Sequence, residues 1–409
     1  MIGIKLSKHK KETMDKIEEY LNPSEVYFKI DDTDSLLVNQ NDIVFKGEKI
    51  IKTKYDTYKH SSISGIVKDI VTMTDYQNNE SKFIKIINDF KEANKFKEQD
   101  LNNITKEEFI NNLKENGIVG LGGAGFPTYI KYDVDNFKTL IVNAVECEPY
   151  ITSDYITCFN NIDKIVEILN LIDKVYNLKE IFIAIKIKNR TLKEKIIPYI
   201  AKNKKIKLIE VPNLYPMGWE KSLVRYIKHT DYNKLPIEKE IIVSNASTIY
   251  SIYESLKYNK PLIEKIVTVS GDNIENSTNI KLKIGTKFSE LKKIFKNYKN
   301  EEMTLITGGP MMGTSVKTDE FIIPNNLNSV IAFKNIKEFK SITCLRCGKC
   351  SDHCPAKICP VLVKDNIENK EELKRLNVNR CIECGICSFV CPSRINLREY
   401  VKEAKKKVK

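Results

Sequence analysis

The sequence predicts a multidomain protein of mixed α/β and α+β class, built from four consecutive modules. Three observations predict it: short apolar runs between turn-forming residues near the start, alternating strand-like and helix-like runs in the middle, and nine of the 11 cysteines between Cys344 and Cys391. A chain of 409 residues can hold several domains of about 100–200 residues each. We place the modules at residues 1–95, 96–260, 261–335 and 336–409.

The first module, residues 1–95, is predicted to consist of short strands. Turn-forming Asn, Asp and Gly separate apolar runs in LVNQNDIVFKGEKII and YKHSSISGIVKDIV. No apolar run approaches the ~18–20 residues of a membrane span, and the charged start lacks the apolar stretch of a signal peptide. We therefore expect a cytoplasmic protein with no integral membrane segment.

The second module, residues 96–260, opens with a helix. Thr105 and Glu108 have the spacing of a capping box, and Asn116-Gly117 is typical of a helix end. After a glycine-rich loop, strand-like runs follow at TLIVNAV, EIFIAIKI, KLIEVP and EIIVSN, and helical periodicity appears in NIDKIVEILNLIDKVYNL and STIYSIYESLKY. This alternation predicts a β-sheet layered with helices.

The third module, residues 261–335, is predicted to be small and rich in strands. It contains the strand-like runs IVTVSG, IKLKIG and MTLITGG around the helix-like run FSELKKIFKN. The fourth module, residues 336–409, carries the clustered cysteines with one helix-forming stretch between their two halves. In a chain without a signal peptide, such clustering favours metal binding over disulfides.

The cysteines form two runs of the same spacing, each ending in Cys-Pro. This is the bacterial ferredoxin spacing, in which the fourth Cys of each run binds the other cluster. Zinc is the alternative, but it favours two separated ligand pairs around one tetrahedron. We predict two 4Fe-4S clusters, one held by Cys344, Cys347, Cys350 and Cys391, the other by Cys381, Cys384, Cys387 and Cys354.

Cys359 is a fifth cysteine in the first run and is surplus to the eight predicted ligands. A small buried apolar role is typical of a free cysteine. The alternative is a thiol that faces a partner protein. The sequence favours the buried role for Cys359.

The glycine-rich loop has the pattern G-x-G-x-x-G at Gly120, Gly122, Gly123 and Gly125. A dinucleotide-binding loop of this pattern follows a strand, whereas here a helix precedes it. Its backbone amides can still cradle a phosphate. The alternative is a tight turn without a ligand.

Longer motifs around this loop carry a family resemblance. The segments GLGGAGFPTYIKY and LIVNAVECEPYITSDY resemble the flavin-binding part of the NADH-oxidising subunit of respiratory complex I, and still more the RnfC subunit of the Rnf electron-transport complex. The same order continues through YPMGWEKSLV, VSNASTIYSIY, VTVSGD, GGPMMG and the two cysteine runs. The resemblance to this RnfC-like family covers the chain from about Asn41 to its end.

The resemblance implies a fold for each module. The first is expected to be β-rich and barrel-sandwich-like, the second a complex I flavoprotein-like Rossmann-type α/β domain that binds FMN and NADH, the third an SLBB-like β-grasp module, and the fourth an α-helical bacterial-ferredoxin-type domain with two 4Fe-4S clusters. In such a protein the cofactors supply the chemistry. No side chain is predicted to be catalytic.

The resemblance also implies cofactor-binding residues. Glycine amides and a lysine suit a phosphate, carboxylates suit ribose hydroxyls, and side-chain amides suit the flavin edge. By position in the matching motifs, the glycine loop wraps the FMN phosphate with a lysine nearby, two asparagines contact the flavin, and an acidic pair lies near the flavin and the nicotinamide nucleotide. These residues are Gly120, Gly122, Gly123, Gly125, Lys131, Asn143, Asn245, Glu146 and Glu148.

Three positions leave roles open. Val145 stands where the complex I type has Asp, and Trp219, the only tryptophan, replaces a small or polar residue. Trp219 can stack on a nucleotide ring, fill the NADH slot or be structural, so FMN is better supported than NADH. Cys147 is expected to pack under the flavin, with a redox role as the alternative.

The predicted function is electron transfer from NADH through FMN and the clusters to an acceptor redox protein. The chain lacks the Gly-Gly-Ile-His-Pro-like start and long tail of the membrane-complex subunits, which favours a stand-alone relative that feeds proline reductase. The alternatives are the RnfC subunit of a membrane Rnf complex, peripheral to the inner face of the membrane; a cobalamin reductase relative; and a wiring subunit without NADH activity.

The net charge of +13 is spread along the chain and accompanies no nucleic-acid-binding motif. We therefore expect no nucleic acid partner. A basic surface for an acidic partner protein is the better interpretation of this charge.

Overall fold

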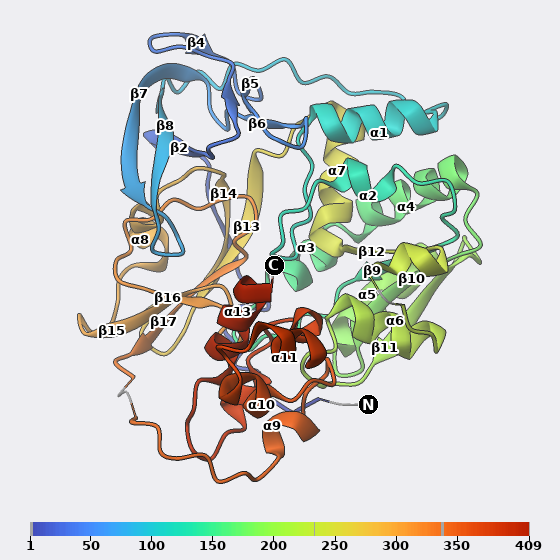
Figure 1. Ribbon diagram of the computed structural model, residues 1–409. Helices are drawn as coiled ribbons and strands as arrows, with labels where there is room; N and C mark the ends of the chain where they lie inside the picture. The colour runs from blue at the N-terminus through green and yellow to red at the C-terminus, as the bar shows by residue number, and fades with distance from the viewer. Residues whose placement is uncertain (1–2, 233, 337–338, 409) are drawn as a thin grey trace.

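A computed structural model describes residues 3–232, 234–336 and 339–408. Its architecture is mixed α/β and multidomain: two small antiparallel sheets, a parallel sheet between helices, a mixed sheet, and a helical C-terminal part (Figure 1). None of the helices in these ranges is both long and apolar enough to cross a membrane.

The N-terminal part is β-rich, as predicted. Strands β2, β8, β7 and β4 form one antiparallel sheet, and β3, β5 and β6 form another. Val26, Ile50, Ile63 and Ile86 are fully buried between them. The strands are β1 (Ile17–Tyr20), β2 (Glu25–Ile30), β3 (Ser35–Leu36), β4 (Ile43–Val44), β5 (Lys49–Lys52), β6 (Tyr58–His60), β7 (Gly65–Thr74) and β8 (Glu80–Asn88).

A parallel sheet of order β11-β10-β9-β12 organises the next part of the chain. Along β9, Leu140 and Val142 pack on one side with α4 and α7, whereas Ile141 packs on the other with α6, so the strand is buried on both faces. The elements are α1 (Lys106–Glu115), α2 (Thr128–Tyr132), β9 (Thr139–Asn143), α3 (Ser153–Asn160), α4 (Ile162–Tyr176), β10 (Glu180–Lys186), α5 (Arg190–Ile200), β11 (Ile206–Val211), α6 (Glu220–Lys228), η1 (Pro236–Lys239), β12 (Ile241–Asn245) and α7 (Ala246–Tyr258).

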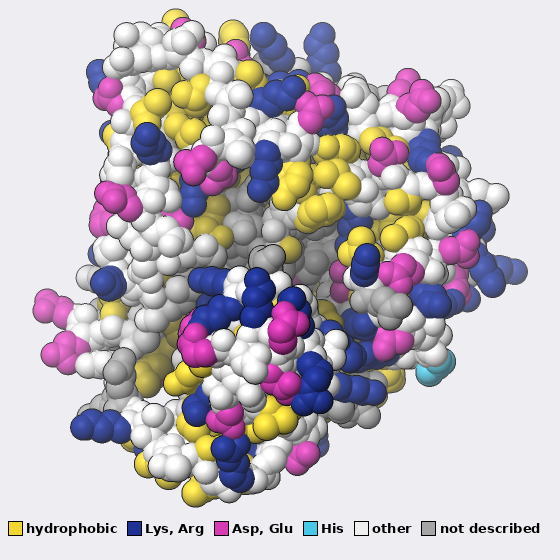
Figure 2. Space-filling model, viewed as in Figure 1, with side chains coloured by type: hydrophobic (Ala, Val, Ile, Leu, Met, Phe, Trp, Pro, Cys, Tyr) yellow, Lys and Arg dark blue, Asp and Glu magenta, His cyan; other side chains and the backbone are white. Residues whose placement is uncertain are grey.

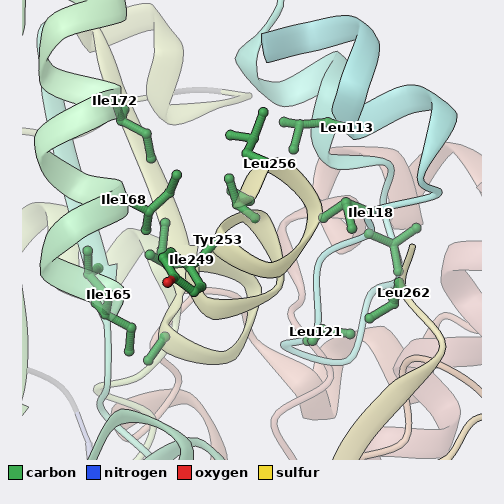
Figure 3. Close-up of a cluster of buried hydrophobic side chains, with 14 of the residues drawn as sticks. Leu113, Ile118, Leu121, Ile165, Ile168, Ile172, Ile249, Tyr253, Leu256 and Leu262 are labelled. Carbon is green, nitrogen blue, oxygen red and sulfur yellow. The ribbon is translucent and has the colours of Figure 1, made fainter. Parts of the chain in front are cut away.

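The helices on one face of this sheet share a large apolar core. Ile165, Ile168 and Ile172 of α4 point toward Ile249 and Tyr253 of α7 (Figure 3). The spacing of these residues follows the helical period, which is why the sequence pattern predicted both helices. The predicted capping box is confirmed too, since Thr105 and Glu108 bond reciprocally at the start of α1.

A six-stranded mixed sheet follows, of order β1-β14-β13-β17-β15-β16. Its strand β1 comes from the N-terminal part and pairs in parallel with β14, with Ile17 opposite Asn279. A boundary at residue 95 therefore separates β1 from the sheet that it completes. The remaining elements are β13 (Glu264–Ser270), β14 (Thr278–Lys283), η2 (Phe288–Leu291), α8 (Lys292–Phe295), β15 (Met303–Thr307), β16 (Thr314–Val316) and β17 (Ser329–Lys334).

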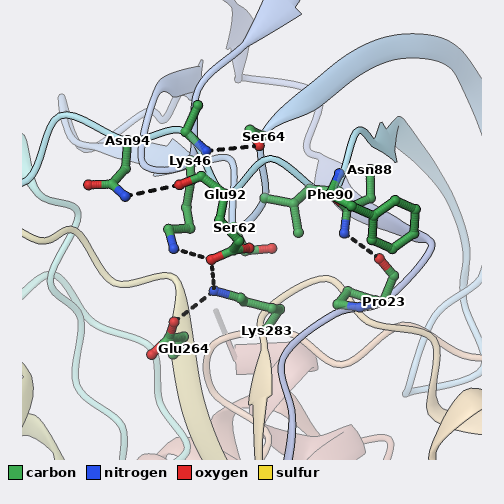
Figure 4. A network of polar contacts seen from close by, with 12 residues as sticks. Pro23, Lys46, Ser62, Ser64, Asn88, Phe90, Glu92, Asn94, Glu264 and Lys283 are labelled. Atoms are coloured by element: carbon green, nitrogen blue, oxygen red, sulfur yellow. Dashed lines mark hydrogen bonds and ion pairs between the residues drawn. The ribbon is translucent and has the colours of Figure 1, made fainter.

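An ionic network also joins the N-terminal sheets to the mixed sheet (Figure 4). The ammonium of Lys283, on β14, lies 2.8 Å from a carboxylate oxygen of Glu264 and 3.6 Å from one of Glu92. Glu92 is bonded in turn by Lys46. Because the Lys283 side chain is only 2% exposed, these partners are what make its burial tolerable.

The C-terminal part is helical and lies between the mixed sheet and the α/β layer (Figure 1). Val401 and Ala404 of α13 are buried against Val363 of α10 and Leu373 of α11. Lys and Arg side chains gather over these helices on the face shown in Figure 2. The elements are α9 (Lys349–Asp352), α10 (Pro360–Asp365), α11 (Lys370–Arg375), η3 (Val378–Arg380), α12 (Ile386–Phe389) and α13 (Leu397–Val408).

Candidate functional site

The candidate site lies at the carboxyl edge of the parallel sheet. Asn143 ends β9 and Asn245 ends β12, and the two asparagines are direct neighbours in the register. The chain order reverses between these two strands, because β10 and β11 follow β9 on its other side. Ligands of open α/β sheets bind at such a switch point.

The glycine loop covers this edge. The amide of Gly120 donates to the carbonyl of Phe126 at 2.8 Å, which closes the loop, and α1 precedes it as predicted. The amides of Gly122, Gly123 and Ala124 donate to no acceptor in the described part of the chain, and all three residues are exposed. Consecutive free amides of this kind suit a phosphate.

Two glycines of the loop fit a ligand for different reasons. A Cβ on Gly122 would lie 2.3 Å from Oδ1 of Asn245, so only glycine allows the loop to approach the end of β12 this closely. Gly123 has φ +107°, and a Cβ there would meet nothing within 4 Å. The loop thus packs closely against the end of β12 at Gly122, whereas the space next to Gly123 is free of described residues.

Asn245 is oriented by Asp154, which carries no role in the sequence prediction. Nδ2 of Asn245 donates to Oδ2 of Asp154 at 3.1 Å, and Ser247 donates to the other carboxylate oxygen. Oδ1 of Asn245 accepts no hydrogen bond from the described residues and lies under Gly122. This amide oxygen is available to a flavin edge.

Asn143 and Lys131 lie near the site with their polar atoms already engaged. Nδ2 of Asn143 donates to the carbonyl of Gly218 at 2.9 Å, and Oδ1 accepts the amide of Val145 at 3.0 Å. The ammonium of Lys131 donates to the carbonyl of Val243 and lies 3.4 Å from the Glu220 carboxylate. Asn143 therefore holds the loop at Gly218, and Lys131 joins α2 to β12 and α6.

Glu146 and Glu148 each keep one buried oxygen without a partner among the described residues. Burial raises the pKa of each carboxyl to about 7; the Lys10 ammonium opposes the rise at Glu146, where the Asp154 carboxyl adds to it. The other Glu148 oxygen accepts the amide of Met311 at 3.1 Å. Unpartnered acceptors of this kind suit the hydroxyl donors of a ribose or ribityl chain.

Two lysines at the site, Lys10 and Lys186, were not predicted from the sequence. Nζ of Lys10 donates to the carbonyl of Glu146 at 2.9 Å, and burial lowers the Lys10 pKa. Burial also lowers the pKa of Lys186, at the end of β10, to about 8. No pattern distinguishes them, because lysines occur throughout this chain.

The second cysteine run packs directly against this site. The hydroxyl of Tyr215 donates to the carbonyl of Cys384 at 2.7 Å. Tyr215, Met311 and Cys384 belong to one buried apolar cluster, and the partly buried Cys147 packs against it. Burial raises the pKa of the Cys147 thiol.

Two cavities in the C-terminal part gather the cysteines. The inner cavity, next to Tyr215 and Met311, is lined by Cys354, Cys381, Cys384 and Cys387. The outer cavity, of about 260 Å³, is lined by Cys344, Cys347, Cys350, Cys359 and Cys391. Each lining contains the first three cysteines of one run and the fourth of the other, the grouping that crossed ligation requires, and the outer lining contains Cys359 in addition.

Cys359 departs from its expected place. The residue is partly exposed and lines the outer cavity, so it is less buried than the small buried apolar role favoured by the sequence requires. Cys158 is fully buried. Trp219 is partly exposed just before α6, with the Arg225 guanidinium 6.0 Å from its ring centroid.

No group of three or more His, Cys, Asp or Glu side chains in the described ranges is arranged to hold a single metal ion. A zinc ion needs four ligands within about 2.3 Å of one point. The thiolates of a cubane bind four different irons and need not converge in this way. The cysteine-rich part is thus compatible with iron–sulfur clusters.

A further cavity, of about 750 Å³, lies between the N-terminal sheets and α1. Its lining contains none of the cysteines or loop glycines, and its lysines include Lys46 and Lys49, which pair with Glu92 and Glu115. The cavity is separate from the site described above.

Known families match two parts of the chain. Residues 1–91 match the RnfC barrel sandwich hybrid domain, and residues 113–254 match the Nuo51 FMN-binding domain. The second match contains the glycine loop, both asparagines and both glutamates of the candidate site.

Curated relatives are C subunits of ion-translocating complexes. That of the ion-translocating oxidoreductase complex of Buchnera aphidicola is 31% identical over 83% of this chain and 74% of its own length. That of the proton-translocating ferredoxin:NAD(+) oxidoreductase complex of Clostridium ljungdahlii is 30% identical over 64% of this chain. The chain spans 58% of the length of that relative and 51% of a further one from Rhodobacter capsulatus.

A solved structure shares the fold. A chain of an NAD+-reducing [NiFe]-hydrogenase in the H2-reduced state superposes with a TM-score of 0.52 over 75% of this chain and 61% of its own. At 13% identity, the likeness concerns the fold alone.

Proposed function

The chain belongs to the RnfC family, the C subunits of ion-translocating oxidoreductase complexes, and on that premise we propose that it carries electrons between NADH and a redox partner through FMN and two 4Fe-4S clusters. The oxidoreductase character, the NADH and the FMN are supported by the matched FMN-binding domain and by the names of the relatives.

One observation carries the proposal: the candidate flavin site touches the cysteine module. Tyr215 bonds the backbone of Cys384, and a Cβ on Gly385 would lie 2.4 Å from the carbonyl oxygen of Met311. Electrons that leave the site therefore meet the inner cavity first. The outer cavity includes the exposed Cys347, which makes it the exit to a partner.

The residues of the site have distinct roles in this proposal. FMN, when bound, accepts a hydride from NADH and releases electrons singly. The free amides of Gly122 and Gly123 would hold its phosphate, and Oδ1 of Asn245 would accept a hydrogen bond from the flavin edge. Glu146 and Glu148 would accept hydrogen bonds from its sugar hydroxyls. Asn143 acts through the loop at Gly218, because both polar ends of its side chain are engaged there.

The identity of the last two modules is part of the proposal. The α+β part after residue 261 is proposed to be SLBB-like, and the helical part ferredoxin-type. The two cavities support clusters with crossed ligation, each lined by the four cysteines assigned to it from the spacing.

The proposed partners are the other subunits of an ion-translocating membrane complex, which would hold this chain peripherally at the membrane. The names of the curated relatives support this choice. The proline reductase favoured by the sequence prediction receives no support from any of these relatives. The first alternative drawn from the sequence, the RnfC subunit of a membrane Rnf complex, is thus the better proposal.

Anaerobic reconstitution with FMN, iron and sulfide tests the function. NADH is expected to bleach the flavin and then the cluster absorbance. Bleaching by dithionite but not by NADH would contradict the NADH step and leave a wiring subunit that takes electrons from another flavoprotein.

A matched pair of variants tests the flavin site itself. Gly122→Ala places its Cβ 2.3 Å from Asn245, whereas Gly120→Ala meets nothing closer than 3.6 Å. Gly122→Ala is expected to weaken FMN binding by about 10-fold or more, a loss of about 1.4 kcal/mol, while Gly120→Ala binds like the wild type. FMN affinity is measured by fluorescence titration. Equal affinity in both variants would contradict the placement of the FMN site next to Gly122.

A further inference from the structure

The outer cavity has one thiol more than a cluster uses. Five cysteines line it, whereas four line the inner cavity. Four thiolates complete the ligation of one 4Fe-4S cluster. Cys359 is the additional residue, because the other four belong to the repeated spacing.

Contacts place Cys359 on the side of Cys350. The hydroxyl of Ser351 donates to Sγ of Cys359 at 3.0 Å and lies 4.0 Å from Sγ of Cys350. The Ser351 hydroxyl thus contacts both thiols. Cys350 is therefore the ligand that Cys359 is best placed to replace.

The second run shows which residue occupies the position equivalent to Cys359 where no additional cysteine is present. Asn396 has the same place in the second run as Cys359 in the first, and Ser388 donates to its Oδ1 at 3.0 Å. Cys359 directly precedes α10, and Asn396 directly precedes α13. Asparagine is favoured at helix N-termini and cysteine is not, so the helix start does not explain Cys359.

We propose that Cys359 is a reserve ligand of the outer cluster, able to bind the iron that Cys350 otherwise holds. The inference rests on the proposed function, since it requires a cluster in the outer cavity. When the Cys350–iron bond breaks, the Cys350 thiolate takes a proton from water. The Cys359 thiol gives its proton to water and forms the new sulfur–iron bond. No electron is transferred in this ligand exchange.

The test compares variants of the full chain after anaerobic reconstitution. Cys350→Ala is expected to keep the wild-type iron content, with an altered EPR signal for the outer cluster. Cys350→Ala combined with Cys359→Asn is expected to lose half of the iron. Cys359→Asn alone supplies the residue of the second run and is expected to keep the full iron content.

Cys387→Ala is the matched control, because Cys387 is the equivalent of Cys350 and no fifth cysteine lines the inner cavity in the described part of the chain. It is expected to lose half of the iron. A circular dichroism melt of each variant reports its folding independently of the clusters.

Three results would overturn the reserve ligand: loss of half of the iron in folded Cys350→Ala, full iron content in the double variant, or full retention in Cys387→Ala. Failure of the proposed function has a different signature. In that case the wild type itself would bind fewer than two clusters, whatever stands at residue 359.

Discussion

The two cysteine runs share their spacing and their local turns, but their surroundings differ. Gly348 and Gly385 occupy the same place in the two runs, with φ of +75° and +77°. A Cβ on Gly348 would lie 3.7 Å from the side chain of Asp352, whereas one on Gly385 would lie 2.4 Å from the backbone of Met311. One run packs against the candidate flavin site and the other lines the proposed exit.

The difference teaches that the spacing of the cysteines predicts the ligands of a cluster, whereas the tertiary contacts around each cavity suggest what that cluster does. In the inner cavity Cys354 and Cys384 are each 8% exposed. The outer cavity is lined by the exposed Cys347 and by Leu345 and Leu362, which are 62% and 42% exposed. Exposed apolar side chains around a cluster are suited to a partner that accepts electrons there.

Removing one ligand from each cavity is expected to have the largest effect and to separate the two roles. Cys384→Ala should lose half of the iron and stop NADH from reducing the outer cluster, because the electron path is cut at its first step. Cys347→Ala should leave the inner cluster reducible by NADH. EPR of freeze-quenched samples distinguishes the clusters; equal behaviour of the two variants would break the inner and outer assignment.

A matched pair of glycine variants sharpens the comparison without removing a ligand. Gly348→Ala adds only the cost of a left-handed backbone, about 1–2 kcal/mol. Gly385→Ala adds that cost and the overlap with Met311, about 2–5 kcal/mol in all. Chemical denaturation of the reconstituted proteins measures the difference, and equal losses would show that the contact at Met311 contributes nothing.

The regular elements followed from the sequence because their patterns are local. The runs TLIVN, EIFIAIK, IKLIEV and IIVSN became β9 to β12, and the helical periodicity of α4 and α7 reflects the core that they share. Strand β1, with the sequence IEEY, has no such signal. Its backbone pairs with β14 far along the chain, and two of its four residues are glutamates.

The residues of the candidate site were only partly accessible to sequence reasoning. The glycine loop and Asn245 come together as the motifs implied, because both belong to the switch point of one sheet. The engagement of Lys131 with Val243 and the approach of Lys10 to Glu146 depend on contacts across the fold. The place of Cys359 in the outer cavity likewise depends on how α10 folds back over the first run.

The smallest expected effect concerns Glu148, which bonds the amide of Met311 beside the inner cavity. Burial raises the pKa of this carboxyl from its usual 4.5 to about 7 in the folded protein. Its contribution to stability is therefore present in full below pH 4.5 and is lost as the pH rises through 7. Glu148→Gln removes this titration.

Between pH 5 and pH 8 the flavin-free wild type is thus expected to lose about 1–3 kcal/mol of unfolding free energy relative to Glu148→Gln. Asp365→Asn is the control beside the outer cavity, where Asp365 forms a surface pair with Arg346 that contributes little. Denaturant titrations at both pH values measure the difference. A wild type that gains stability relative to Glu148→Gln as the pH rises would show that the carboxylate is stabilised as an anion, and the inner cavity would then lie next to a fixed negative charge.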